Sequence, residues 1–208
     1  MIHGLYAITP DEPDTTELLR KVRLALRGGA RLLQYRNKSA APALRQQQAQ
    51  ALRQLTREFA ATFIINDEVE LAAHVEADGV HLGAADGDLA AARAALGRGK
   101  LIGASCYNRL PSAYEAVRQG ADYVAFGAFF PSSVKPGAVQ ADVALLVEAR
   151  RELNVPLVAI GGITPDNGAS LVAAGAHALA VISALWDSAD IVQTTKKFSN
   201  LFQQGRTA

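Results

Sequence analysis

Residues 157–183 read LVAIGGITPDNGASLVAAGAHALAVIS, and this stretch predicts the fold. It begins with an apolar run at 157–162 and ends with another at 179–183. A helix-length segment at 167–174 and the small-residue turn Gly175-Ala176 lie between the two runs. Continuously apolar runs are typical of parallel strands that are buried on both faces. The stretch therefore predicts one strand–helix–strand unit of a parallel sheet.

The same alternation extends through the chain in both directions. Amphipathic segments with one apolar stripe separate the apolar runs, and the clearest of them is residues 43–59. Pro111 and Pro165 stand where the first turn of a helix tolerates proline. The predicted strands are 5–9, 32–36, 63–66, 79–82, 101–105, 123–127, 157–162 and 179–183, and the predicted helices are 43–59, 90–96, 112–119, 143–153, 167–174 and 191–202.

An internal repeat supports eight strand–helix units. A small-residue turn ending in alanine precedes every second strand, and its alanines, Ala30, Ala77, Ala121 and Ala176, are 47, 44 and 55 residues apart. Eight units in 208 residues average 26 residues each, which is near the lower size limit of a (β/α)8 TIM barrel. We expect one such barrel over residues 1–208. A doubly wound open sheet is the alternative, but no glycine-rich dinucleotide turn follows the first strand.

Composition limits the class of protein. The chain has 21 Lys and Arg against 20 Asp and Glu, so it lacks the basic excess of a nucleic-acid binder. No stretch approaches the apolar length of a membrane helix, and the first residues do not resemble a signal peptide. The single cysteine, Cys106, excludes an internal disulfide. These features predict a cytoplasmic globular protein that binds neither nucleic acid nor membrane.

Charged side chains follow the predicted strands where a barrel of this kind forms its active site. Arg36 and Lys38 follow the second strand, and Lys135 follows the sixth. These cations suit a polyanion. Asp67 follows the third strand and Asp86 lies just beyond the fourth. Carboxylates beside cations suit Mg²⁺ that bridges phosphate oxygens.

A second anion site is predicted at the other side of the barrel mouth. Gly161 and Gly162 end the seventh strand and offer backbone N–H groups, and Ser183 ends the eighth strand. Loops after strands 7 and 8 commonly bind phosphate in this fold.

Each of these residues also has a purely structural interpretation. Asp67 could be the N-cap of a helix, and so could Asp86 or Asp88. The two glycines could merely allow close approach of backbone. His81 fits a hydrogen-bonded core histidine somewhat better than a catalytic base, and Cys106 fits a small buried hydrophobe. It is the joint position at strand ends that favours a functional role.

The chain resembles the thiamine phosphate synthase family over residues 5–202. Seven motifs occur in order on the expected strands, and together they are specific. They are Gln34-Tyr35-Arg36-x-Lys38, Ile65-Asn66-Asp67, Asp78-Gly79-Val80-His81-Leu82-Gly83, Ile102-Gly103-x-Ser105, Phe130-Pro131-Ser132-x-x-Lys135, Ala159-Ile160-Gly161-Gly162-Ile163 and Val181-Ile182-Ser183.

The resemblance implies a transferase of thiamine biosynthesis. Such an enzyme joins 4-amino-2-methyl-5-(hydroxymethyl)pyrimidine diphosphate to hydroxyethylthiazole phosphate, giving thiamine monophosphate and pyrophosphate through a pyrimidinyl carbocation. By motif, Asp67 and Asp86 would hold Mg²⁺, and Ser105 and Lys135 would be catalytic. The pyrimidine diphosphate would contact Gln34, Arg36, Lys38, Asn66, Ser105 and Lys135, and the thiazole phosphate would contact Ser132, Ser133, Gly161, Gly162, Ile182 and Ser183.

Three positions depart from the family pattern. The family's Thr-x-Thr-Lys is Ser132-Ser133-Val134-Lys135 here, so one hydroxyl is missing. Ala84 replaces a glutamine, and Asn37 replaces a residue that is commonly acidic. We expect weaker binding of the thiazole phosphate but retained activity.

Three other functions stay open on the same fold. A thiazole tautomerase would place histidine after the sixth strand, where this chain has Ala128. A sugar-phosphate isomerase or epimerase would use the Gly161-Gly162 site but not the diphosphate cluster. A catalytically silent barrel would bind ligands without turnover. A homodimer is compatible with so compact a barrel.

Overall fold

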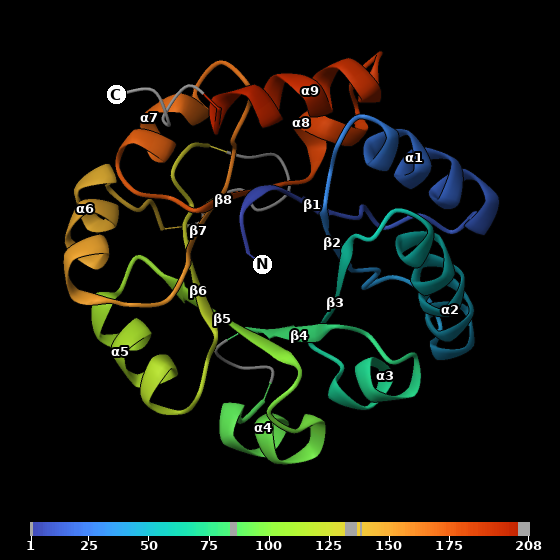
Figure 1. Ribbon diagram of the computed structural model, residues 1–208, viewed down its shortest axis with the longest axis horizontal. Coiled ribbons are helices and arrows are strands. Elements are labelled where there is room, and N and C mark those ends of the chain that lie inside the picture. Colours follow the sequence, from blue (N-terminus) through green and yellow to red (C-terminus); the bar gives the residue numbers. More distant parts are fainter. Residues whose placement is uncertain (1, 84–86, 132–136, 138, 204–208) are drawn as a thin grey trace.

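The computed structural model describes residues 2–83, 87–131, 137 and 139–203. Eight strands form a closed barrel in the order of the sequence, and helices surround it (Figure 1). Each neighbouring pair is parallel, and the pairing of β1 with β8 closes the ring. The predicted (β/α)8 barrel is therefore confirmed, and the open sheet is excluded.

All eight predicted strands are present, with bounds that differ by up to two residues. They are β1 (Gly4–Ile8), β2 (Leu32–Tyr35), β3 (Thr62–Asn66), β4 (Gly79–Leu82), β5 (Leu101–Tyr107), β6 (Tyr123–Phe126), β7 (Leu157–Ile160) and β8 (Ala178–Val181). The helices of the described residues are α1 (Thr15–Arg27), α2 (Pro42–Glu58), α3 (Val69–His74), α4 (Leu89–Leu96), α5 (Leu110–Arg118), α6 (Val143–Glu152), α7 (Gly168–Ala173), α8 (Ser183–Trp186) and α9 (Ile191–Leu201).

Three helices were not predicted. α1 begins at an N-cap, Asp14, whose carboxylate accepts hydrogen bonds from the next turn, and it buries Leu18 and Val22. α3 and α8 have six and four residues, too few to show a helical period. Pro111 lies in the first turn of α5 as expected. Pro165 does not lie in a helix: it stands in the turn that precedes α7.

The alanine repeat corresponds to one repeated helix ending. The N–H of each repeat alanine donates to the carbonyl five residues earlier, at 3.1, 2.9, 3.0 and 3.0 Å for Ala30, Ala77, Ala121 and Ala176. The residue before each alanine has a positive φ, and at three of the four positions it is glycine. This is the Schellman geometry that ends a helix, so the repeat marks where a helix turns back to the sheet.

The residue after three of these alanines supports the neighbouring strand. Asp78 and Asp122 accept hydrogen bonds from the N–H groups of Phe63 and Ile102. The Nδ1 atom of His177 accepts from the N–H of Leu157 in the same way. Each side chain satisfies a backbone donor at the amino end of a strand. That end of the barrel therefore carries repeated structural contacts.

The barrel interior is packed with apolar and aromatic side chains. Tyr6, Ile64, Tyr123 and Val158 are almost completely buried there and form a cluster separate from the larger core under the helices. Gly103 provides space for the ring of Tyr123, since a side chain at this position would overlap that ring. The packing of the interior therefore requires glycine at position 103, beside the large ring of Tyr123.

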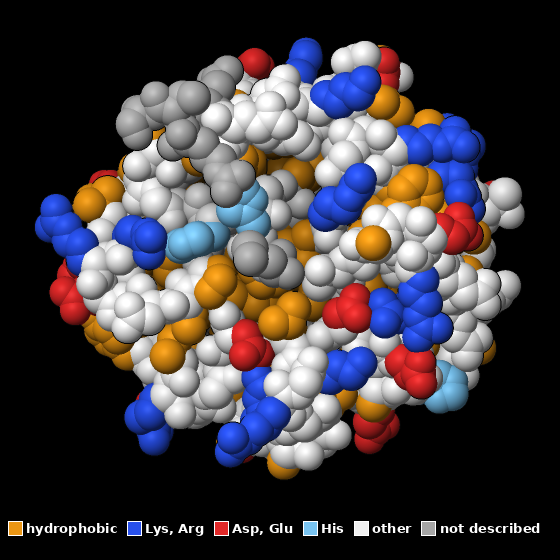
Figure 2. Space-filling view, viewed as in Figure 1, with side chains coloured by type: hydrophobic (Ala, Val, Ile, Leu, Met, Phe, Trp, Pro, Cys, Tyr) orange, Lys and Arg blue, Asp and Glu red, His pale blue; other side chains and the backbone are white. Residues whose placement is uncertain are grey.

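The molecular surface carries charges of both signs. Lys and Arg side chains alternate with Asp and Glu around the periphery of one face, and apolar side chains lie at its centre (Figure 2). This distribution agrees with the nearly balanced charge of the chain. Within the described ranges, no helix is both long and apolar enough to cross a membrane.

Candidate active site

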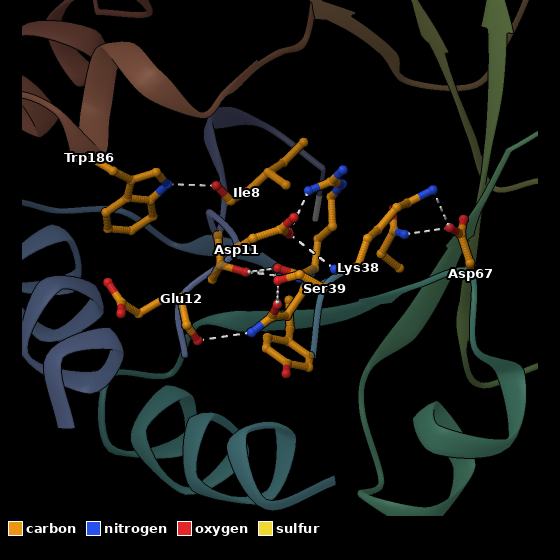
Figure 3. Close-up of polar contacts among 12 residues, drawn as sticks. Ile8, Asp11, Glu12, Lys38, Ser39, Asp67 and Trp186 are labelled. Carbon is orange, nitrogen blue, oxygen red and sulfur yellow. Dashed lines mark hydrogen bonds and ion pairs between the residues drawn. The ribbon is translucent and has the colours of Figure 1, made fainter. Parts of the chain in front are cut away.

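The carboxyl ends of β2 and β3 bring three predicted site residues together. The Nζ atom of Lys38 lies 3.2 Å from Oδ2 of Asp67. The side-chain amide of Asn66 donates to the same oxygen at 2.6 Å. Figure 3 shows Lys38 and Asp67 pointing toward each other. We call Lys38, Asn66 and Asp67 the β2–β3 cluster.

The β2–β3 cluster borders a cavity of about 300 Å³ that is also lined by Arg36 and Asn37. The backbone of Asp67 has φ of 61°, and its N–H donates to the carbonyl of His81 in β4 at 2.8 Å. The side chain of Asp67 is 21% exposed. The carboxylate is thus fixed at the rim of the cavity, where a ligand can reach it.

The loop after β1 holds the loop after β2, and sequence reasoning missed this. The carboxylate of Asp11 accepts from the guanidinium of Arg36 at 2.8 Å and from the N–H of Lys38 at 3.0 Å (Figure 3). The hydroxyl of Thr9 exchanges hydrogen bonds with the backbone of Arg36. Asp11 and Glu12 follow the first strand directly, so the strand-end argument could have found them.

Gln34 and Ser105 lie at the two ends of a buried hydrogen-bonded chain. The amide Nε2 of Gln34 donates to Oη of Tyr6, which lies 2.8 Å from Oη of Tyr123. Oη of Tyr123 is 3.2 Å from Nδ1 of His81, and Nε2 of His81 is 2.9 Å from Oγ of Ser105. These five residues lie on strands from different sides of the barrel, namely β2, β1, β6, β4 and β5 (Figure 1).

Burial keeps the members of this chain uncharged. Desolvation raises the pKa of Tyr6 and of Tyr123 well above the usual value for tyrosine. Desolvation also lowers the pKa of His81 to about 4, against an opposing effect of the Asp67 charge. His81 is only 8% exposed, and both of its ring nitrogens have partners. The interpretation of His81 as a hydrogen-bonded core histidine is confirmed.

The other predicted anion site lies at the loops after β7 and β8. Gly161 and Gly162 have φ of 102° and 62°. A Cβ atom on Gly162 would lie 2.7 Å from the carbonyl oxygen of Phe130, so the close approach of the two backbone segments requires glycine here. Ile182 precedes α8, which Ser183 begins. Because β7 pairs with β8, all four site residues follow neighbouring strands.

The remaining structural interpretations have definite outcomes. Asp67 is not a helix cap, since the N-cap of α3 is Glu68. Asp88 caps α4 by accepting from the N–H groups of two residues in its first turn. Cys106 is buried, and desolvation raises the pKa of its thiol to about 12, as suits an inert side chain.

Several sequence predictions lie outside the described residues. These concern the metal ligand Asp86, the catalytic cation Lys135 and the phosphate-binding Ser132 and Ser133. Val134 and Ala84, where the chain departs from the family pattern, lie outside them as well.

Comparison with known proteins gives a consistent family. The thiamine monophosphate synthase family matches residues 5–185. The chain is 59% identical to the thiamine-phosphate synthase of Methylobacillus flagellatus, covering 97% of this chain and 96% of that protein. It is 54% identical to the thiamine-phosphate synthase of Aromatoleum aromaticum, covering 97% of each.

A solved structure agrees. The thiamine phosphate pyrophosphorylase of Pyrococcus furiosus superposes with a TM-score of 0.87 at 35% identity, covering 97% of this chain and 96% of that one. Six of the seven motifs that carry the resemblance lie within the described residues, and each falls on or beside a strand of the one closed barrel. The chain therefore belongs to the thiamine monophosphate synthase family.

Proposed function

We propose that this transferase joins an aminopyrimidine diphosphate, 4-amino-2-methyl-5-(hydroxymethyl)pyrimidine diphosphate, to hydroxyethylthiazole phosphate. The products are thiamine monophosphate and pyrophosphate. The observation that supports this most is the β2–β3 cluster with Arg36 beside it. Its two cations, one amide and one carboxylate line one cavity, which Asn37 and the Arg45–Glu68 ion pair also line. A tautomerase needs proton transfer and has no use for such a group.

The cations of this cavity suit the diphosphate. Arg36 presents a planar fork of donors, and Asp11 fixes its position from the loop after β1. Lys38 is 52% exposed, so its ammonium group can turn from Asp67 toward a bound phosphate. Positive groups set in advance around a leaving group stabilise the charge that develops on it.

The carboxylate of Asp67 fits Mg²⁺ that arrives with the substrate. The described residues contain no group of three or more His, Cys, Asp or Glu that could hold a metal. Mg²⁺ commonly uses only one or two carboxylates together with substrate phosphates. Asp67 supplies one such carboxylate at the cavity rim, and Asp86 is the second that the motif implies. Bound Mg²⁺ would neutralise part of the charge on the diphosphate.

The reaction we propose begins with cleavage of the bond between the pyrimidine methylene and the diphosphate oxygen. Arg36, Lys38 and Lys135 then stabilise the departing pyrophosphate, and Gln34 and Ser105 orient the ring that keeps the positive charge. The thiazole nitrogen attacks this carbocation. Holding the two reactants together supplies much of the rate, because the step becomes effectively unimolecular.

The thiazole phosphate belongs, in this proposal, at the loops after β7 and β8. Gly161 and Gly162 have no side chains of their own to cover their N–H groups, and Ile182 and Ser183 follow the adjacent strand. By motif, Ser132 and Ser133 would contact the same phosphate. Val134 offers no hydroxyl, so replacing it with threonine should lower the KM for the thiazole phosphate.

A pyrophosphate-release assay tests the function. The protein is incubated with the pyrimidine diphosphate, the thiazole phosphate and Mg²⁺, and each component is omitted in turn. We expect turnover only when all three are present. Asp67→Asn, which removes the charge but keeps the side-chain volume, should lower kcat/KM by at least about 100-fold, as loss of one electrostatic contact to a developing charge does.

Glu70→Gln is the matched control, since it neutralises an exposed carboxylate in the first turn of α3. This variant should keep wild-type activity. Binding of Mg²⁺ in the presence of pyrophosphate, measured by calorimetry, gives a readout besides activity and should weaken only in Asp67→Asn. Ligand binding without turnover in the wild type would instead support the silent barrel, and metal-independent isomerisation of a thiazole would support the tautomerase.

Two further expectations stay predictions. A homodimer is compatible with the compact barrel, and sedimentation equilibrium would test it. A cytoplasmic location follows from the sequence features, and fractionation of cells would test that.

A further inference from the structure

The hydrogen-bonded chain inside the barrel has a direction. Nε2 of Gln34 donates to Oη of Tyr6. A hydroxyl group has one proton, and Tyr123 is the other partner of Tyr6, so we assign the Tyr6 proton to the hydrogen bond with Oη of Tyr123. With this assignment Tyr123 gives its proton to Nδ1 of His81. A neutral imidazole then carries its proton on Nε2 and donates it to Oγ of Ser105.

The two ends of this hydrogen-bonded chain leave opposite groups unused. Oγ of Ser105 accepts from His81, so its own proton is left to donate to a ligand. Among the described residues, none donates to Oε1 of Gln34, so this oxygen is left to accept. Gln34 and Ser105 lie near the carboxyl ends of β2 and β5, on the side where this fold binds substrates.

We call this hydrogen-bonded chain from Gln34 to Ser105 the relay. We propose that it fixes which groups of the pyrimidine site donate and which accept hydrogen bonds, with Tyr6, Tyr123 and His81 as positioning residues. The inference rests on the proposed function and deepens it. An aminopyrimidine edge carries an N–H donor beside a ring-nitrogen acceptor, which matches one acceptor and one donor. The corresponding 4-pyrimidinone carries a carbonyl and a ring N–H, which reverses both.

The relay is what prevents the site from adapting to the reversed edge. Rotating the amide of Gln34 would face Oε1 toward Tyr6 and would require every proton in the chain to change sides. Tyr6, Gln34 and Tyr123 are at most 2% exposed, so water cannot replace a lost partner. A site built to hydrogen-bond its substrate rejects an analogue whose groups leave its buried partners unpaired.

The tautomer of His81 tests the relay without any substrate. Nitrogen chemical shifts of a ¹⁵N-labelled sample distinguish an imidazole protonated on Nε2 from one protonated on Nδ1. The protein has four histidines, and the signal missing from a His81→Gln sample identifies His81. We expect Nε2–H in the wild type. A His81 protonated on Nδ1 would overturn the proposed polarity whatever the enzyme proves to catalyse.

Substrate discrimination tests the functional part. Wild type and Tyr123→Phe are compared for kcat/KM with the 4-amino and the 4-oxo pyrimidine diphosphates. Tyr123→Phe should lower the preference for the amino compound by about tenfold or more, through the KM of that substrate, because one buried hydrogen bond orders the whole relay. The KM for the thiazole phosphate should not change.

Two comparisons separate positioning from general loss of structure. Thr195→Val removes another buried hydroxyl, in α9, and should keep the wild-type preference. His81→Gln can still donate to Ser105 from its amide, so it should retain more of the preference than His81→Leu. An unchanged preference in a folded Tyr123→Phe would overturn the proposal. If the wild type has no turnover, the proposed function fails, and the tautomer of His81 still decides the relay.

Discussion

Adding one methyl group at Gly103 should disturb the centre of the barrel. A Cβ atom at this position would lie 2.5 Å from Cε2 of Tyr123 and nearer still to Cζ and Oη. Ordinary contacts begin at 3.4 Å, so the ring would have to retreat by about 0.9 Å or more. The φ of Gly103 is not positive, so the conflict is steric and not one of backbone conformation.

The retreat would break the relay as well as strain the packing. Oη of Tyr123 is 2.8 Å from Tyr6 and 3.2 Å from His81, and a move of that size directly away from either partner takes it beyond hydrogen-bonding distance. Overpacking a core costs about 1–3 kcal/mol, and each lost buried hydrogen bond adds about 1 kcal/mol. Gly103→Ala should therefore lower the free energy of unfolding by about 2–5 kcal/mol.

Urea unfolding measures this change. Gly99→Ala is the matched control, because a Cβ atom there meets no atom within 4 Å and the backbone φ is not positive. It should be neutral or stabilising by up to about 1 kcal/mol. Adding Gly103→Ala to Tyr123→Leu should cost far less than adding it to the wild type, giving an interaction energy of at least about 1 kcal/mol.

Two results would refute this reasoning. One is a Gly103→Ala variant as stable as Gly99→Ala. The other is a cost that stays the same in the Tyr123→Leu background, since the conflict would then lie with another neighbour. Recovered stability in the double variant should not restore the preference for the aminopyrimidine, because the relay hydroxyl is gone.

Three other perturbations follow from the same structure. Since the pKa of His81 is about 4 when folded against 6.5 ordinarily, the unfolded chain binds the proton first as pH falls. Unfolding free energy should then drop by about 2 kcal/mol from pH 7 to 5, and the urea curves of His81→Gln should show a smaller drop. Gly162→Ala should raise the KM for the thiazole phosphate about tenfold or more, because the added Cβ would displace the backbone of Phe130 and Pro131 after β6. Gly97→Ala, at a similar φ but in open space, should leave this KM unchanged. Equal KM values for the two variants would count against the role of the Gly162 contact. Asp78→Ala should cost about 2 kcal/mol of stability by removing contacts to α2 and β3, yet leave kcat unchanged, and a fall in kcat would place Asp78 in the chemistry.

The strands and the fold could be predicted because both leave local signals. A buried parallel strand needs a short apolar run, and the alanine turns repeat at the spacing of two strand–helix units. α1 also left a signal, Asp14 before an amphipathic segment, and could have been found. α8 could not, because its four residues are held by tertiary contacts, including the hydrogen bond from the indole of Trp186 to the carbonyl of Ile8 (Figure 3).

The site could be predicted only as far as strand ends determine it. Lys38, Asn66 and Asp67 meet because neighbouring parallel strands end side by side. The meeting of Tyr6 and Tyr123 is different, since 117 residues separate them and the contact crosses the interior. It depends on barrel closure and on side-chain rotamers, which leave no trace in a local pattern. Glycine at 103 was the nearest signal, and its meaning became clear only with the ring beside it.

The motif at residues 78–83 shows why a family signature does not by itself identify reacting groups. Asp78 supports β3 at the amino end of the barrel, and Gly79 leaves room for Leu101 in β5. His81 lies three residues beyond Asp78, about 10 Å along the strand at 3.3 Å per residue, and joins the relay to Ser105. One short motif thus contains a stability residue, a packing residue and a positioning residue. Its acidic member is the one farthest from the chemistry, so charge within a motif is a poorer guide to function than position along the strand.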